Sequence, residues 1–319
     1  MSAALQVPSE QASLATDGIA RARALAELAP LARNLGITID AADQARPIAV
    51  TRGRDRILLG QRHWFYAKSA CVQFDIMFGT VVPEERDGIA TCDFSEPRRH
   101  ILRGSGRSFF FSSLAEDVAS TRLYLDYLDP RPGDVVLDLG SYCGLSASAF
   151  SDAVGPDGRV FCFEPDPRNF EILCRNLDEL GAGNVVRERK AISDRCDTLL
   201  FSSEGSMGSA LIGLEGRNRD RAVAVRTTTI PDILEHHAIE RVACVKMDIE
   251  GAEYAVLESC ADLIGRLGAR WMIEVHGDAY PRGAVDVERL RRLFDAADYL
   301  TLVLPVGDSP FKMLFARPR

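Results

Sequence analysis

The sequence predicts an α/β protein built on a doubly wound, mostly parallel sheet with an antiparallel edge. Three observations support this fold class. From Leu114 onward, short β-branched runs alternate with helical segments at the spacing of a parallel sheet. One run, residues 135–140, ends in an acidic residue and a glycine, as strands do before helices in such sheets. Two apolar runs follow the last predicted helix, and they predict the antiparallel edge.

Residues 1–112 form a mixed N-terminal region in this interpretation, and residues 113–319 form the main domain. A helical pattern covers about residues 19–35, where four leucines share one face. Short apolar runs broken by Gly, Pro and Arg then predict strands at residues 56–60, 71–75 and 99–102. We expect this helical and β-rich region to serve substrate binding or dimerisation.

The main domain alternates predicted strands and helices, with one interruption. The predicted strands cover residues 135–140, 159–164, 185–190, 242–248 and 270–276. The predicted helices cover residues 114–128, 145–154, 167–180, 230–237, 252–267 and 285–297. An inserted hairpin is predicted at residues 199–201 and 223–226, and closing strands at residues 299–304 and 312–315.

The composition excludes several classes of protein. The 319 residues carry a formal net charge of -8 and a pI of about 5.3, which argues against nucleic acid or an anionic membrane as partner. The eight cysteines include no C-x-x-C pair, which argues against a zinc knuckle. No signal-peptide pattern and no apolar run of membrane-spanning length is present, so we expect a cytoplasmic protein. The sequence leaves a homo-oligomer open.

Polar residues cluster at four predicted strand ends, where doubly wound sheets bind ligands. The first group is Asp138, Gly140, Ser141 and Gly144. The glycines let the backbone approach a ligand, and the helix that follows offers free N–H groups. The acidic residue suits a ligand with an ammonium group and repels a pyrophosphate. The stretch also lacks the third glycine of the dinucleotide fingerprint, although a turn without a ligand fits it as well.

The second and third groups follow the next two predicted strands. Glu164 is placed to accept both hydroxyls of a ribose, although an acid at a helix start is the alternative interpretation. Ser193 and Asp194 follow the third strand, where a polar side chain can meet the edge of an adenine. Asp194 is equally suited to capping a turn.

The fourth group, residues 246–253, reads Lys-Met-Asp-Ile-Glu-Gly-Ala-Glu. A solvated helix start explains Glu250 and Glu253. It does not explain Lys246 and Asp248, which alternate with apolar residues on a central strand, where charges are costly unless paired or used. We therefore expect Asp248 to contact the same cofactor as the three groups upstream.

Together these residues resemble the FkbM-type methyltransferases. The resemblance rests on residues 135–144, 163–165, 191–194 and above all 246–253, whose Lys-x-Asp-x-Glu-Gly-x-Glu is the most distinctive signature of that family. It implies a Rossmann-like class I methyltransferase fold and S-adenosylmethionine (S-adenosyl-L-methionine) as cofactor. It also implies methyl transfer to a hydroxyl of a sugar, glycan or secondary metabolite. One departure is visible: the first motif of the family commonly reads Gly-Ala-Asn-x-Gly, whereas this chain has Gly140-Ser141-Tyr142-Cys143-Gly144.

Methyl transfer to a hydroxyl requires alignment of donor and acceptor and a group that accepts the proton. The candidates at the strand ends are His276, Asp248, Lys246 and Glu274. His276 and Glu274 are two residues apart on one strand and share a face. We expect one of the first two to act as base and one of the last two to orient it. A structural, hydrogen-bonded histidine is the alternative interpretation of His276.

Three other interpretations fit part of the pattern. A divalent metal ion held by Asp248, Glu250, Glu274 and His276 is one, although the sequence alone does not require a metal. An NAD-dependent oxidoreductase is the second, and the missing glycine argues against it. A non-catalytic, cofactor-binding partner protein is the third, and the intact acidic residues at the strand ends make it the poorer fit.

Overall fold

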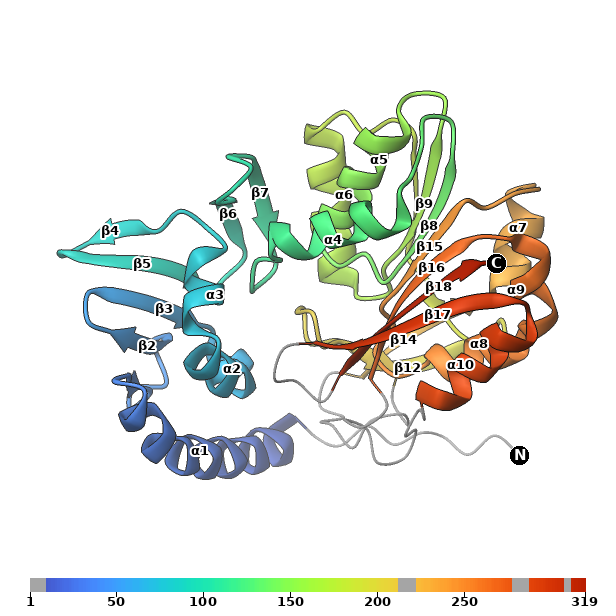
Figure 1. The fold of residues 1–319 in the computed structure, drawn as a ribbon. Helices are drawn as coiled ribbons and strands as arrows, with labels where there is room; N and C mark the ends of the chain where they lie inside the picture. The colour runs from blue at the N-terminus through green and yellow to red at the C-terminus, as the bar shows by residue number, and fades with distance from the viewer. Residues whose placement is uncertain (1–9, 212–221, 277–286, 307–310) are drawn as a thin grey trace. The chain divides into compact units, whose positions relative to one another are not determined.

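The computed structural model describes residues 10–211, 222–276, 287–306 and 311–319, and Figure 1 shows the chain as a ribbon. The chain divides into two compact units, Met1–Ala119 and Ser120–Arg319. No helix within the described ranges is both long enough and apolar enough to cross a membrane.

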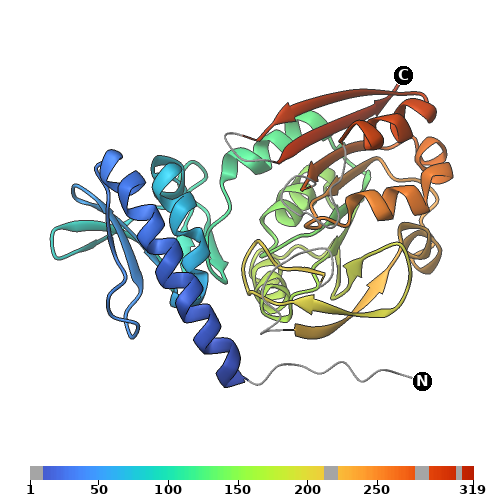
Figure 2. The ribbon, with the colours of Figure 1, turned by 90° about the horizontal axis from the view of Figure 1, so that it is seen from below.

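The first unit combines helices with two small sheets. Its helices are α1 (Glu10–Asn34), the 3₁₀ helix η1 (Gln61–Tyr66), α2 (Ala67–Val72) and α3 (Phe74–Gly79). Its strands are β1 (Thr38–Asp40), β2 (Ile48–Arg52), β3 (Asp55–Leu59), β4 (Glu84–Arg86), β5 (Ile89–Phe94), β6 (Arg98–Ile101) and β7 (Ser108–Phe111). Five strands form a sheet in the order β1-β2-β3-β5-β4, and β6 pairs with β7. In Figure 2, α1 is the long blue helix, which contacts β1 and α2.

Most predicted elements of this unit form. The helix predicted at residues 19–35 is confirmed as part of α1, and β3 and β6 confirm the strands at residues 56–60 and 99–102. The strand predicted at residues 71–75 is wrong, because α2 and α3 cover that stretch. The buried residues there recur at intervals of three and four, which is the period of a helix. They are Ala67, Ala70, Cys71 and Phe74.

The second unit alternates strands and helices. Its helices, with α4 at the junction of the units, are α4 (Val118–Leu128), α5 (Leu145–Val154), α6 (Pro167–Glu179), α7 (Ile230–His236), α8 (Glu253–Ser259), α9 (Ala261–Leu267) and α10 (Val287–Ala296). Its strands are β8 (Val135–Leu139), β9 (Arg159–Phe163), β10 (Val185–Glu188), β11 (Ala191–Ile192), β12 (Thr198–Ser202), β13 (Ala210–Leu211), β14 (Ala222–Thr228), β15 (Cys244–Met247), β16 (Arg270–Val275), β17 (Tyr299–Pro305) and β18 (Lys312–Pro318).

Seven of these strands form the main sheet, in the order β10-β9-β8-β15-β16-β18-β17. The first five run parallel, and β18 and β17 pair antiparallel at one edge. The predicted doubly wound sheet with an antiparallel edge is therefore confirmed. The strand order reverses between β8 and β15, so the carboxyl ends of these strands form the switch point at which such sheets bind ligands.

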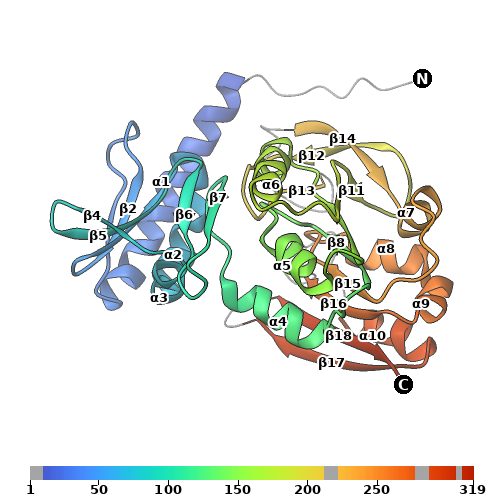
Figure 3. The ribbon, with the colours of Figure 1, turned by 90° about the horizontal axis from the view of Figure 1, so that it is seen from above.

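Helices cover both faces of the main sheet (Figure 3). On one face, α4, α5 and α6 pack through a core that includes Leu128, Phe150 and Leu173. On the other face, α7 to α10 pack through a second core that includes Trp271 and Phe294. Central strands covered on both sides are normally apolar throughout, and all of β15 is buried. Lys246, the charged residue within β15, therefore needs partners of opposite charge.

A smaller sheet, in the order β11-β14-β12-β13, interrupts the alternation. β12 pairs antiparallel with β14, which confirms the inserted hairpin. Two predicted elements differ from the structure. The third strand of the main sheet, β10, ends at Glu188, and residues 191–192 pair with β14 instead. The helix predicted over residues 252–267 is divided at Cys260 into α8 and α9.

In the first unit, His100 is buried between aromatic rings. The centre of its ring lies 5.2 Å from that of Phe94 and 6.3 Å from that of Phe111. Burial, together with nearby Arg98, lowers the pKa of His100 from 6.5 to about 4. The unfolded chain therefore binds this proton more readily than the folded chain does. The contribution of His100 to stability is complete above pH 6.5 and is lost as the pH falls toward 4.

We expect the variant His100→Phe to lose less stability on acidification than the wild type. Between pH 7 and pH 5, the wild type should lose about 2 kcal/mol more of its free energy of unfolding, since pH 5 lies about 1.5 units below the unfolded pKa. The measurement is urea unfolding followed by the fluorescence of Trp64, with Trp271→Phe introduced in both proteins. Equal losses in the two proteins would contradict the assignment.

Candidate active site

The switch point begins with the turn that joins β8 to α5. Gly140 and Gly144 both have left-handed backbone conformations, with φ of 84° and 86°. The N–H groups of Gly140 and Ser141 each donate to the carbonyl oxygen of Phe163 at 3.0 Å, which ties the turn to the end of β9. A Cβ atom on Gly140 would lie 1.8 Å from the carbonyl oxygen of Asp248. The ends of β8 and β15 therefore approach so closely that a side chain at this position cannot be accommodated.

Lys246 lies between two carboxylates at the same point. Its Nζ is 3.7 Å from Asp138 Oδ1 and 3.7 Å from Asp248 Oδ2, and it donates to the carbonyl oxygen of Gly140. Asp138 is fully buried, and Ser146 Oγ donates to its Oδ2 at 2.7 Å. Burial raises the pKa of Asp138, while Lys246 and Ser146 act in the opposite direction. The lysine and the two acids singled out in the sequence thus form one largely buried ionic group.

Glu164 lies at the end of β9 and is buried. Its Oε2 accepts a hydrogen bond from the backbone N–H of Tyr142 at 2.9 Å, and its Oε1 accepts one from the N–H of Asp166 at 2.9 Å. Burial and the neighbouring Asp166 raise the pKa of Glu164 well above its usual value. Tyr142 has a φ of 45°, which is rare for a bulky residue, and Glu164 helps to hold it there. Glu164 therefore shapes the glycine turn, which the sequence did not reveal.

Ser193 and Asp194 follow β11 in the smaller sheet and not the end of β10. The N–H of Ser193 donates to the carbonyl oxygen of Thr228 at 2.9 Å, and its Oγ donates to Asp194 Oδ1 at 3.0 Å. Asp194 is exposed and pairs with Arg195 at 3.1 Å. Within the described part of the chain, no hydrogen bond or ion pair links these two residues to the glycine turn. Their contact with an adenine stays a prediction.

His276 follows β16 and has carboxylates on both sides of its ring. Its Nδ1 is 2.9 Å from Glu253 Oε1. Its Nε2 is 3.6 Å from Asp248 Oδ1, 3.8 Å from Glu250 Oε1 and 3.9 Å from Glu274 Oε1. His276 and Glu253 are buried, whereas the side chains of Asp248 and Glu274 are 28% and 20% exposed. The structure thus brings together the three residues that the sequence nominated for chemistry beside Lys246.

These charges alter one another's protonation. Burial alone would lower the pKa of His276, but Glu250 and Glu253 outweigh it and raise that pKa well above its usual value. Burial and the nearby Asp248 raise the pKa of Glu274 to about 8. A carboxyl that is buried beside other carboxylates holds its proton more tightly than an isolated one does. The cluster therefore favours bound protons on His276 and Glu274, and any other cation that binds there would compete with them.

Glu253 is a site residue that the sequence interpretation missed. Its assignment to a solvated helix start is wrong, because its side chain is fully buried. Its Oε1 accepts from the N–H of Gly251 at 3.0 Å and also faces the imidazole of His276. Glu250 and Gly251 have φ of 55° and 102°, so the chain turns back here and α8 starts close to the strand ends. The consecutive acid and glycine were the signal for this turn.

Known methyltransferases match this chain. The methyltransferase FkbM domain family matches residues 138–301, which is more than half of the chain. The hexuronic acid methyltransferase AglP of Haloferax volcanii is 27% identical over 171 residues, covering 53% of this chain and 65% of that protein. The 2-O-methyltransferase NoeI of Sinorhizobium fredii is 29% identical over 142 residues, covering 40% of this chain and 57% of that protein. The chain thus spans less than two thirds of the length of either relative.

Among solved structures, the methyltransferase FkbM of Methylobacillus flagellatus KT matches with a TM-score of 0.42 and 16% identity. That match covers 61% of this chain and 50% of the other. The family match, which contains all four groups of strand-end residues, confirms the resemblance predicted from the sequence motifs.

We expect Gly140→Ala to destabilise the second unit far more than Gly133→Ala does. Both positions have left-handed backbones, so both variants carry a strain of about 1 kcal/mol. A Cβ at Gly133 meets no atom within 4 Å, whereas one at Gly140 collides with the backbone of Asp248. The extra cost at Gly140 should be about 2 kcal/mol or more, as for other overpacked sites. The measurement is urea unfolding of both variants. Equal costs would show that β8 and β15 do not meet as described.

Proposed function

Because the chain belongs to the FkbM methyltransferase family, we propose that it is an S-adenosylmethionine-dependent O-methyltransferase. The observation that carries the proposal is the family match over residues 138–301, which contains the strand ends of the candidate site. Two relatives are named as a hexuronic acid methyltransferase and a 2-O-methyltransferase, which supports a hydroxyl of a sugar or glycan as acceptor. A hydroxyl of a secondary metabolite, also implied by the sequence resemblance, presents the same chemistry.

Features of the switch point suit this cofactor. Asp138 Oδ1 is buried and accepts no hydrogen bond from the residues that the structure describes, so it has capacity for an ammonium group. The amino-terminal N–H groups of α5, which starts directly after Gly144, suit the carboxylate of the cofactor. The acidic side chains of Asp248 and Glu250 at the strand ends suit a sulfonium cation. The ammonium, carboxylate and sulfonium groups of the methionine part therefore each have a complementary group at the switch point.

The proposed contacts follow the strand ends. Gly140, Ser141 and Gly144 would lie along the methionine part, with Asp138 toward its ammonium group. Glu164 would accept the ribose hydroxyls, and Ser193 and Asp194 would lie toward the adenine. When bound, S-adenosylmethionine supplies an electrophilic methyl group, and the electron pair of the broken carbon–sulfur bond stays on the sulfur atom.

Asp248 is the best-placed group to accept the proton of the acceptor hydroxyl. Its side chain is partly exposed, so an acceptor can reach it. His276 is nearly inaccessible, and its Nδ1 is engaged by Glu253, so its proposed role is to position Asp248. Lys246, at 3.7 Å from Asp248 Oδ2, orients the same carboxylate from the opposite side. Glu274 completes the wall that faces the acceptor.

The first unit lies outside the family match. The family match begins only at residue 138, so it does not assign a role to residues 1–112. We propose that they contribute to acceptor binding or to dimerisation. A cytoplasmic location also stays a proposal.

The proposal is tested by calorimetry with S-adenosylhomocysteine and by transfer of a tritiated methyl group to a panel of sugars that includes hexuronic acids. We expect binding of one S-adenosylhomocysteine per chain and labelling of a sugar hydroxyl. Absence of binding would contradict the proposal. Binding without transfer to any acceptor would favour a non-catalytic partner protein.

We expect Asp248→Asn to lower kcat for methyl transfer by about 100-fold or more, as loss of a general base does. The amide keeps the size of the side chain, so the affinity for S-adenosylhomocysteine should change by less than about tenfold. The control is Asp262→Asn, which alters an exposed acid at the start of α9 and should leave both quantities unchanged. Wild-type turnover in Asp248→Asn would exclude Asp248 as the base.

A further inference from the structure

Three donor atoms of the candidate site converge on one point. Asp248 and Glu274 each offer a carboxylate oxygen and His276 offers a ring nitrogen, and these three atoms all lie within 4.8 Å of one another. The Nε2 of His276 is 3.6 Å from Asp248 and 3.9 Å from Glu274, which is too long for hydrogen bonds. Separations of this size fit two ligands of one metal ion at a wide angle, with bonds of about 2.0–2.2 Å to each.

A buried carboxylate fixes the orientation of the His276 imidazole. Glu253, which is fully buried, faces Nδ1 of His276 at 2.9 Å. A carboxylate at this distance accepts the Nδ1 proton. A metal ion that displaces the proton of Nε2 would then bind this nitrogen on the side of Asp248 and Glu274. Metal-ligating histidines have this arrangement, in which a carboxylate holds the nitrogen that does not bind the metal. In turn, Glu253 is anchored by the N–H of Gly251 at 3.0 Å.

The donors also leave one side open. Glu274 lies within β16, and Asp248 and His276 each lie one residue beyond the end of a strand, β15 and the adjacent parallel β16, so the central sheet positions all three. His276 is 2% exposed and closes the inner side, whereas the two carboxylates reach solvent. Glu250 Oε1, at 3.8 Å from the same imidazole nitrogen, adds a further oxygen at the rim. An ion held here would keep coordination positions for water or an acceptor.

We propose that Asp248, Glu274 and His276 bind one divalent metal ion of the Mg²⁺ or Mn²⁺ class. Two or three carboxylate oxygens with one imidazole favour this class over Zn²⁺ or Cu²⁺, which prefer more nitrogen or sulfur. The ion would bind the acceptor oxygen and lower the pKa of its hydroxyl, and the proton would pass to the second oxygen of Asp248. This use of the ion rests on the proposed function, whereas binding of the ion does not.

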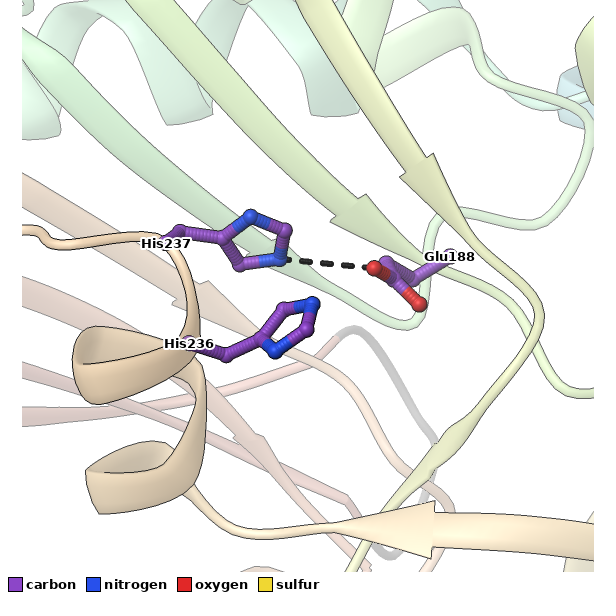
Figure 4. Close-up of side chains that lie close together, drawn as sticks. All are labelled: Glu188, His236 and His237. Carbon is purple, nitrogen blue, oxygen red and sulfur yellow. Dashed lines mark ion pairs between the residues drawn. The ribbon is translucent and has the colours of Figure 1, made fainter.

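A second group of possible ligands provides a comparison (Figure 4). Glu188 at the end of β10 and His236 and His237 at the end of α7 also place donor atoms within 4.8 Å of one another. There, however, Lys190 Nζ lies 3.2 Å from Glu188 Oε2, and His237 Nε2 lies 3.4 Å from Glu188 Oε1. An ammonium group beside the only carboxylate of the group disfavours a divalent cation. At the proposed site Lys246 also lies 3.7 Å from Asp248, but Glu274 there supplies a second carboxylate. We therefore assign the second group to an ion pair and use it as the control.

The test is titration of the full chain with MnCl₂, followed by the electron paramagnetic resonance signal of the free ion. The wild type should remove one Mn²⁺ per chain from the signal. Glu274→Gln and Asp248→Asn each replace one ligand by an amide of the same size and should bind Mn²⁺ about tenfold more weakly or worse. His236→Gln, which alters an exposed ligand of the second group, should bind Mn²⁺ as the wild type does.

Calorimetry with S-adenosylhomocysteine on the same samples, without metal, shows that each variant is folded and keeps its cofactor site. It also keeps a failure of the metal site distinct from a failure of the proposed function. The inference is overturned if the wild type removes no Mn²⁺ while still binding S-adenosylhomocysteine. It is equally overturned if Glu274→Gln and Asp248→Asn bind Mn²⁺ as tightly as the wild type, or if His236→Gln alone abolishes binding.

Discussion

The buried ammonium group of Lys246 holds the ends of the two central strands together. It lies within β15, where burial of a lone charge costs several kcal/mol, and it is stabilised by Asp138 on β8 and by Asp248 just beyond its own strand. Its hydrogen bond to the carbonyl oxygen of Gly140 joins the turn after β8 to the same group. The contact between Gly140 and Asp248, which excludes any side chain, is compatible only with this close approach.

The acids around Lys246 differ in how far they are exposed to solvent. Asp138 is fully buried and has a hydroxyl partner, so it stabilises the turn and is suited to a fixed ligand cation. Asp248 is partly exposed, so it is the acid that a diffusing acceptor or a metal ion can reach. Two carboxylates on one lysine thus have different chemistry because one of them faces water. Glu253, buried behind His276, has a third role, since it orients a ring that itself is inaccessible.

The alternation of strands and helices was predictable because each element of the main sheet has its own apolar period and its own breaker. The members of the site were predictable where a charge stands on an apolar strand, as at Asp138 and Lys246. The partners of these residues were not, because pairing across strands depends on register: Lys246 lies opposite Asp138 only because β15 pairs with β8. The location of Ser193 could not be predicted for the same reason, because the short strand before it, β11, pairs with β14 in the smaller sheet. The strand predicted at residues 71–75 was wrong for another reason, because a short apolar run does not distinguish a strand from a helix.

The spacing of the family signature has a physical explanation in this fold. Lys246 and Asp248 are two residues apart at the end of β15, so they can share one side of the sheet and pair with each other. Glu250 then takes a left-handed conformation, which costs a non-glycine residue about 1 kcal/mol, and Gly251 continues the reversal. The chain thereby returns so that Glu253, the first residue of α8, meets the imidazole of His276 from the side opposite Asp248. The position of the final acid of Lys-x-Asp-x-Glu-Gly-x-Glu is therefore explained by the histidine that it contacts, which directly follows the neighbouring strand β16.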